Sequence, residues 1–254
     1  MDLTLQGSVG RLEAWLASPE SDFECPGVVV VPGFPTDPGG GGANSYNTFP
    51  GLADRIAEEA RMHALTFAFR GLATSEGHFS LFGWRRDLRV AIDALRATEG
   101  VKGIYLLGFG TGGALAVDAA AADGDVEGVI SVAAPADFQD CAGRPRELLS
   151  HARLCQAISD PAFPPDFNRW AKELQEVSTV RAAEKLTETT ALLVLHGSND
   201  DAVPPLDARA IADAHGLADL RIIEGARHHL RHDPRAMAIA VGWLDRRGSS
   251  PTSR

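Results

Sequence analysis

The sequence predicts an α/β fold, in which helices cover both faces of a mostly parallel, doubly wound sheet. Short apolar runs alternate with segments of helical periodicity along most of the chain, and this alternation is typical of parallel strands joined by helices. Several runs, such as residues 27–31, are apolar at every position, as expected for strands buried on both faces. With 254 residues, the chain can bury one large core.

The elements of the first third follow from these periods. Residues 11–16 alternate between polar and apolar side chains, which is typical of a half-exposed edge strand. The β-branched run at 27–31 predicts a central strand, and helical spacing of apolar residues predicts a helix over 49–63. A second strand at 64–69 and a helix at 84–98 follow in the same way.

The centre of the chain carries the most distinctive pattern. Residues 104–115 read Ile-Tyr-Leu-Leu-Gly-Phe-Gly-Thr-Gly-Gly-Ala-Leu and lead into an alanine-rich segment that ends near residue 122. A buried strand, a cluster of glycines and a helix in succession predict a sharp strand-to-helix turn. Residues 129–133 predict the next buried strand.

The stretch from about 139 to 190 breaks the alternation. It contains no convincing strand and three weakly amphipathic pieces, at 146–159, 167–176 and 180–186. About 50 residues between two sheet strands is long for a connection inside a compact domain. We therefore predict a small helical lid insertion, with two ordinary crossover helices as the alternative.

The alternation then resumes and ends before the C-terminus. The remaining predicted elements are a strand at 191–195, a helix at 206–215, a strand at 220–223 and a helix at 233–246. We expect a single domain over residues 1–246. The tail at 247–254 is rich in small and polar residues and is predicted to be disordered.

Composition excludes several function classes. The net charge of -10 argues against a nucleic-acid partner, because phosphate binding needs a basic surface. No apolar run approaches the roughly 20 residues of a membrane span. The N-terminus has no signal-peptide pattern, and three scattered cysteines fit a reducing compartment, so we expect a cytoplasmic protein.

Five short motifs occur in order, each at the C-terminal end of a predicted strand. They are Pro32-Gly33-Phe34, Arg70-Gly71 with Ser75-Glu76-Gly77, Gly108 to Gly112, His196-Gly197 with Asp200, and Gly225-Ala226-Arg227-His228. With these motifs the chain, from about Arg11 to Arg246, resembles the α/β-hydrolases, in particular their bacterial dienelactone-hydrolase-like and acyl-peptidase-like branch. The resemblance implies the α/β-hydrolase fold.

The resemblance also implies a site. In the family the aspartate at the position of Asp200 and the histidine at the position of His228 form the acid and base of a catalytic triad. The loop at Gly33 and Phe34, together with the residue after the nucleophile, here Thr111, is expected to supply the backbone N–H groups of an oxyanion hole. Because parallel strands end at one edge of the sheet, these residues should meet there.

One triad position departs from the family pattern. The turn of the family reads G-x-S-x-G with serine as nucleophile, whereas this sequence has Gly110 at the central position. Without an oxygen or sulfur there, no acyl-enzyme forms at that position. Thr111, or Cys141 or Cys155 from the lid, are the alternative nucleophiles.

Neither a cofactor nor a metal ion is expected. His228, His229 and His232 form a local cluster, but no carboxylate motif completes a zinc site. The expected partner is a small-molecule substrate or ligand, and a homodimer is common in the family.

Three hypotheses for function follow. The first is a hydrolase-like protein that acts on a small ester, lactone or related carbonyl compound through the pair of Asp200 and His228, without a serine nucleophile. The second is a catalytically inactive homologue that binds a small ligand or a protein partner. In the third, Gly110 was introduced into an ordinary serine hydrolase to trap a substrate.

Overall fold

The protein is built on one eight-stranded sheet. The computed structural model describes residues 1–20, 24–40 and 46–248. The strand order is β1-β2-β4-β3-β5-β6-β7-β8, and only the pairs β1–β2 and β2–β4 are antiparallel. The strands are β1 (Asp2–Gln6), β2 (Arg11–Ala17), β3 (Cys25–Val31), β4 (His63–Phe67), β5 (Val101–Phe109), β6 (Val126–Val132), β7 (Ala191–Gly197) and β8 (Asp219–Ile223). The predicted mostly parallel sheet is confirmed.

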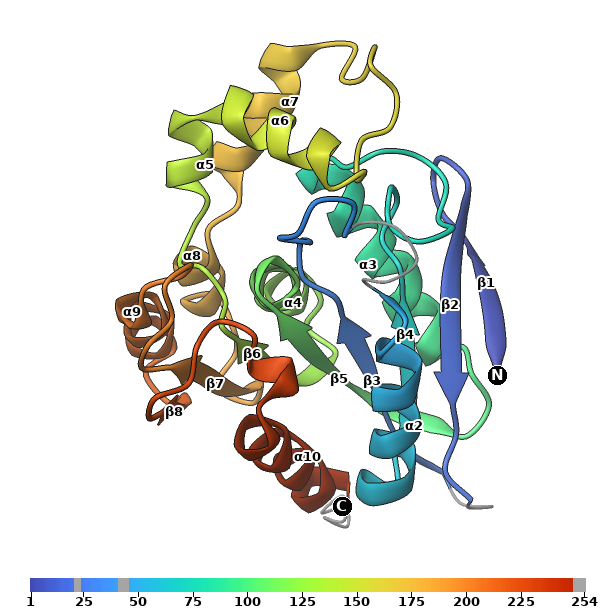
Figure 1. Cartoon of the computed structure of the whole chain (residues 1–254). Helices are drawn as coiled ribbons and strands as arrows, with labels where there is room; N and C mark the ends of the chain where they lie inside the picture. The colour runs from blue at the N-terminus through green and yellow to red at the C-terminus, as the bar shows by residue number, and fades with distance from the viewer. Residues whose placement is uncertain (21–23, 41–45, 249–254) are drawn as a thin grey trace.

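Helices cover both faces of this sheet (Figure 1). On one face, α2 (Phe49–Ala60) packs on β2 and β4 and contacts α10 (Pro234–Gly248). On the other face lie α3 (Leu81–Arg96), α4 (Thr111–Ala122), α8 (Thr179–Ala183) and α9 (Pro205–His215), each in contact with the next. A short 3-10 helix, η1 (Leu230–His232), precedes α10.

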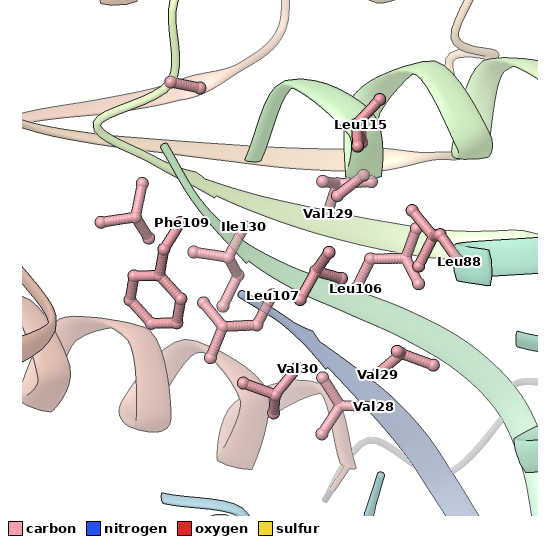
Figure 2. Packing of buried hydrophobic residues seen from close by; sticks show 14 of the residues in the cluster. Val28, Val29, Val30, Leu88, Leu106, Leu107, Phe109, Leu115, Val129 and Ile130 are labelled. Atoms are coloured by element: carbon pink, nitrogen blue, oxygen red, sulfur yellow. The ribbon is translucent and has the colours of Figure 1, made fainter. Parts of the chain in front are cut away.

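The core lies between the sheet and these helices. The four valines at 28–31 of β3 are fully buried, as their unbroken apolar run predicts. Figure 2 shows valines of β3 and leucines of β5 packed on both faces of the sheet, with Leu88 of α3 and Leu115 of α4 on one of these faces. β3 and β5 pair side by side, which places the loops that follow them next to each other.

The prediction that residues 11–16 form an edge strand is wrong. β2 has a neighbour on each side, and β1 forms the edge of the sheet. β1 was not predicted, because it is only five residues long and Leu5 is its one buried side chain. No helix in the described ranges is long and apolar enough to cross a membrane.

Four helices connect β6 to β7. They are α5 (Gln139–Gly143), α6 (Pro145–Leu154), α7 (Phe167–Glu176) and α8; the sequence analysis did not predict α5. α8 packs between α4 and α9 in the layer that covers the sheet, and its Thr179 side chain donates a hydrogen bond to the Pro135 carbonyl at 2.6 Å. α5 to α7 lie beyond the strand ends instead (Figure 1).

The last helix is longer than predicted. α10 runs through Gly248, whereas the disordered tail was predicted to begin at residue 247. The Arg247 guanidinium lies 4.1 Å from the centre of the Trp243 ring one turn earlier in the same helix. Gly248 packs beside Met62, so a contact with a distant segment supports the end of the helix. Residues 249–254 of the predicted tail lie outside the described ranges.

Candidate active site at the strand-to-helix turn

The glycine-rich turn between β5 and α4 has the sharp geometry that the sequence predicts. A Cβ on Gly112 would lie 2.1 Å from the Pro32 carbonyl oxygen, and one on Gly108 would lie 2.3 Å from that of Gly112. Neither position has room for a side chain, since real Cβ contacts are longer than 3.0 Å. These glycines allow the turn to pack tightly against the end of β3.

Gly110 is different, because the space beside it is open. It adopts φ 52° and ψ -122°. Among the described residues, apart from its chain neighbours, the one atom within 4 Å of a Cβ built on Gly110 is His228 Nε2, at 3.7 Å. A side chain at position 110 would therefore lie next to the His228 Nε2 atom. A small molecule has room where that side chain would stand.

His228 and Asp200 form a hydrogen-bonded pair at the C-terminal edge of the sheet. His228 Nδ1 lies 2.9 Å from Asp200 Oδ2, and the Asp200 side chain is fully buried while that of His228 is 19% exposed. Asp200 Oδ1 accepts hydrogen bonds from the backbone N–H groups of Ala202 and Val203. Asp200 thereby fixes the proton on Nδ1 and leaves Nε2 as a free base.

A second histidine, which the sequence analysis assigned no role, holds the same carboxylate. His196 Nε2 lies 3.2 Å from Asp200 Oδ2 and 2.9 Å from the Val203 carbonyl oxygen, and its side chain is fully buried. Burial acts to raise the pKa of Asp200, but hydrogen bonds from His196, His228 and Val203 hold this pKa well below its usual range. The sequence contained a signal for this role of His196, because His196 begins the His-Gly motif four residues before Asp200.

The loop after β3 supplies candidate donors for an oxyanion. A Cβ on Gly33 would lie 2.8 Å from the Phe109 carbonyl oxygen, so this loop packs directly on the turn. Within the described part of the chain, the backbone N–H groups of Phe34 and Thr111 have no hydrogen-bond acceptor. Two such N–H groups beside the turn can stabilise a developing negative charge.

The alternative nucleophiles lie elsewhere. Thr111, Cys141 and Cys155 do not line the cavity above Gly110. Burial, together with the charge of Asp37, raises the pKa of the Cys155 thiol, which donates a hydrogen bond to the Pro35 carbonyl. Burial also raises the pKa of Cys141, so neither thiol forms a thiolate readily.

A cavity of about 380 Å³ opens above the turn. It is lined by residues of five segments that are far apart in sequence: Gly33, Phe34, Pro35, Thr36, Asp37, Gly40, Phe49, Phe109, Gly110, Val132, Ala133, His228, His229, Leu230, Arg231 and His232. Predicted site residues Gly33, Phe34, Gly110 and His228 therefore share one cavity, and Asp200 lies behind His228. Arg231 also lines this cavity and was not predicted, because it has no sequence signal apart from its place after His228.

The histidine cluster does not have the geometry of a metal site. Among residues 1–20, 24–40 and 46–248, no group of three or more His, Cys, Asp or Glu side chains is placed to hold a metal ion. His228 Nδ1 is engaged by Asp200, and His232 Nε2 lies 3.2 Å from an Arg231 nitrogen.

Solved structures with the same fold include several hydrolases. Est1E from Butyrivibrio proteoclasticus is 20% identical with a TM-score of 0.72, and the match covers 96% of each chain. XC6422 from Xanthomonas campestris, described as a serine hydrolase without lid, is 23% identical with a TM-score of 0.65 over 100% of this chain and 96% of that one. The Pyrococcus furiosus esterase Pf2001 is 15% identical with a TM-score of 0.70 over 98% and 91%.

At these identities the likeness establishes the fold alone. No curated protein matches the sequence. The model of the alpha/beta hydrolase family matches residues 28–240, which include the turn at Gly110, Asp200 and His228. The chain belongs to the alpha/beta hydrolase family.

Proposed function

We propose that this protein hydrolyses a small activated ester or lactone by adding water directly, without a covalent intermediate. The observation that carries the proposal is the position of His228 Nε2, which lies 3.7 Å from the empty Cβ position of Gly110 while Nδ1 is bound to Asp200. A base thus faces a space that can hold the attacking water. Gly110 stands in place of the serine of the family motif.

The proposed reaction is a single addition and elimination. A water in the space beside Gly110 gives a proton to His228 Nε2 while its oxygen attacks the carbonyl carbon. The N–H groups of Phe34 and Thr111 stabilise the resulting oxyanion. The C–O bond to the leaving group then breaks, the leaving oxygen takes the proton from His228, and the products are an acid and an alcohol.

The magnitudes restrict the substrate. General-base catalysis contributes about 100- to 10,000-fold, whereas removal of the nucleophile from a serine triad costs about a million-fold. An ester with a good leaving group or a strained lactone is therefore required. Est1E, a neighbour in fold, has been solved with ferulic acid bound, and the motif resemblance to dienelactone hydrolases supports the same carbonyl chemistry.

We further propose that α5 to α7 form a lid over the site. The His151 ring of α6 lies 5.8 Å from the Phe34 ring, and both His151 Nε2 and Cys155 Sγ are within hydrogen-bond range of the Pro35 carbonyl. These contacts connect α6 to the loop that supplies the Phe34 N–H group.

The test is a screen of activated esters and lactones with matched variants. We expect slow hydrolysis by the natural protein, a loss of about 100-fold or more in His228→Ala, and no loss in His63→Ala, whose histidine lies at the opposite end of the sheet. Gly110→Ser should raise the rate and give an acyl adduct in intact-mass spectrometry, while the natural protein gives none. Equal rates in the natural protein and His228→Ala would overturn the proposal.

The absence of a side-chain nucleophile at Gly110 favours one alternative, an inactive homologue that binds a small ligand in the same cavity. Two results would establish it. The natural protein would show no rate that depends on His228, and a ligand would bind with an affinity that changes in Gly110→Leu, which fills the cavity.

A further inference from the structure

Two imidazole rings contact the same carboxylate oxygen behind the cavity. His228 Nδ1 lies 2.9 Å from Asp200 Oδ2, and His196 Nε2 lies 3.2 Å from the same atom. The proposed reaction uses the first contact, and His196 takes no step in it. The side chains of Asp200 and His196 are both fully buried, so the second contact is shielded from bulk water, where hydrogen bonds are electrostatically weaker.

The contacts of His196 indicate which of its nitrogens carries the proton. Nε2 faces two oxygen acceptors, Asp200 Oδ2 and the Val203 carbonyl at 2.9 Å, so it must carry a proton to bond to either. Nδ1 is buried and has no hydrogen-bond partner in the described part of the chain. A proton on Nδ1 would be a buried donor without an acceptor, which is costly. His196 is therefore a neutral imidazole whose N–H group is on Nε2.

The other oxygen of Asp200 is occupied by backbone groups. Oδ1 accepts from the N–H groups of Ala202 and Val203, at 2.9 and 2.8 Å. The N–H groups of the two histidines therefore share Oδ2. Burial acts to raise the pKa of Asp200, whereas the hydrogen bonds from His196 and His228 act to lower it, so both histidines stabilise the charged carboxylate.

Sharing of Oδ2 affects the protonated form of His228 more than the neutral form. When His228 takes a proton on Nε2, the nearby charge of Asp200 stabilises the resulting imidazolium. A carboxylate oxygen that also accepts from His196 has less electron density to offer to His228. The contact with His196 thus disfavours the imidazolium, while the neutral ring, which carries no charge, loses less.

The other ionisable groups around His228 act independently of Asp200. Its chain neighbour Arg227 and Asp201, next to Asp200, are exposed. Four more groups lie in the cavity wall, and among the described residues none of them is hydrogen-bonded to the Asp200 carboxylate: Asp37, His229, Arg231 and His232. A substitution of His196 therefore leaves the electrostatic effects of these groups on His228 in place.

We infer that His196 is a positioning residue that makes His228 a weaker proton acceptor, through the oxygen of Asp200 that both histidines share. His196 thereby sets how far toward acidic pH His228 stays an unprotonated base. This inference rests on the proposed function for the task of the base. The proton affinity of His228 is nevertheless measurable without any turnover.

An NMR titration of the His228 ring against pH tests the inference. The chain has 8 histidines, and the signal that is missing in His228→Asn identifies the ring. We expect His196→Leu, which lacks the donor, to raise the midpoint of this titration by about 0.5 to 1 pH unit. The amide nitrogen of His196→Gln is as many bonds from the backbone as Nε2, so this variant can donate to Oδ2. Its midpoint should stay close to that of the natural protein.

His215→Leu is the matched control. His215 Nε2 also lies within hydrogen-bond range of a backbone carbonyl, that of Thr190 at 3.1 Å, and its Nδ1 is also buried without a partner among the described residues. Thr190 precedes β7 whereas Asp200 follows it, so His215 lies at the opposite end of the sheet. His215→Leu should leave the His228 midpoint unchanged.

Two results would overturn the inference. One is a midpoint in His196→Leu that equals or falls below that of the natural protein. The other is a rise of the same size in His196→Gln or His215→Leu, which would show that the N–H group of His196 is not the cause. His196→Asn, whose amide is too short to reach the position of Nε2, should give the same rise as His196→Leu and replaces it if that variant does not fold.

A pH–rate profile separates this inference from the proposed function. With p-nitrophenyl acetate as substrate, the acidic limb of kcat/KM reports the protonation of the base in the free enzyme. This limb should move to higher pH in His196→Leu and stay in place in His196→Gln, whereas a merely structural role would lower the plateau without moving the limb. Hydrolysis that depends on His228, with a limb that His196→Leu does not move, would refute the inference and keep the function. A raised NMR midpoint without any hydrolysis would do the reverse.

Discussion

At the scale of single residues, the site depends on one glycine and one carboxylate. Gly110 adopts a φ of 52°, and among the described residues no atom outside its chain neighbours lies closer than 3.7 Å to a Cβ built on it. Asp200 is fully buried and receives hydrogen bonds from two histidines and two backbone N–H groups. The first residue leaves room for water, and the second orients the base that would activate it.

The conformation of Gly110 predicts that any side chain at this position lowers the free energy of unfolding. Gly110→Ala should lower the free energy of unfolding by about 1–3 kcal/mol, because a left-handed φ strains a residue with a Cβ. Within the described ranges, no atom is close enough to obstruct that Cβ. Urea denaturation measures the difference. Gly51→Ala, in the exposed first turn of α2, is the control and should not destabilise the protein. A Gly110→Ala variant as stable as the natural protein would contradict this account.

Asp200 predicts a dependence of stability on pH. Its pKa is lowered from 3.8 in the folded state, so the ionised carboxylate stabilises the fold above the unfolded-state pKa. This contribution is lost as the pH falls through the lower folded-state value. Asp200→Asn should therefore destabilise the protein by about 1–3 kcal/mol at pH 7, with a smaller difference from the natural protein below pH 3.8.

Urea denaturation between pH 3 and pH 7 measures this difference. Asp201→Asn, at the exposed neighbouring position, is the matched control and should show no such trend. A destabilisation by Asp200→Asn that stays constant across this range would contradict the assigned role of the charge.

At the scale of elements, a buried ion pair joins the end of β4 to α3. Arg70 Nη2 lies 2.5 Å from Asp87 Oδ1 and Arg70 Nε lies 2.9 Å from Asp87 Oδ2, with side-chain exposures of 5% and 0%. The Asp87 carboxylate also accepts from the Arg70 backbone N–H. Arg70 belongs to a motif that the sequence analysis associated with the family, and the structure gives it this local role.

Removing one partner of this pair should be strongly destabilising. Arg70→Met should lower the free energy of unfolding by about 3–5 kcal/mol, because Asp87 would remain buried and unpaired. Arg11→Met removes the exposed pair with Glu76 and should leave stability within experimental error. Chemical denaturation of both variants measures their free energies of unfolding. Equal destabilisation by Arg70→Met and Arg11→Met would show that burial does not determine how much each ion pair contributes to stability.

At the scale of the whole molecule, one apolar cluster extends from β1 to α10. It includes Leu5 near the N-terminus, Leu244 near the C-terminus, and Trp170 and Leu174 from α7 of the proposed lid. The Trp170 indole also donates a hydrogen bond to the Phe79 carbonyl at 3.1 Å. α7 and the sheet thus share buried contacts.

These shared contacts predict that the protein unfolds as one unit. Far-ultraviolet circular dichroism and tryptophan fluorescence should give coincident transitions in urea. Trp170→Phe removes the fluorescent probe in α7. The free energy of unfolding measured from the remaining tryptophans should stay within about 1 kcal/mol of that of the natural protein. An earlier, separate transition that disappears in this variant would show that the lid unfolds independently.

The sequence alone determined the mostly parallel sheet, the sharp glycine turn, and the identity of Gly110 at its tip. Apolar periodicity and glycine spacing are local properties, and the parallel order of the strands brings their C-terminal ends to one edge. The meeting of Gly110, His228 and Asp200 followed from that rule. The edge strand β1 and the length of α10 did not, because both depend on contacts with distant segments.

Only the tertiary structure decided which nitrogen of His228 faces Gly110 and what else surrounds the cavity. The hydrogen bond to Asp200 sets the orientation of the imidazole, and Asp200 is itself held by His196. Arg231 faces the cavity because its guanidinium packs on Phe49, a residue more than 180 positions earlier in the chain. Such contacts arise from packing between remote segments, and no local pattern in the sequence records them.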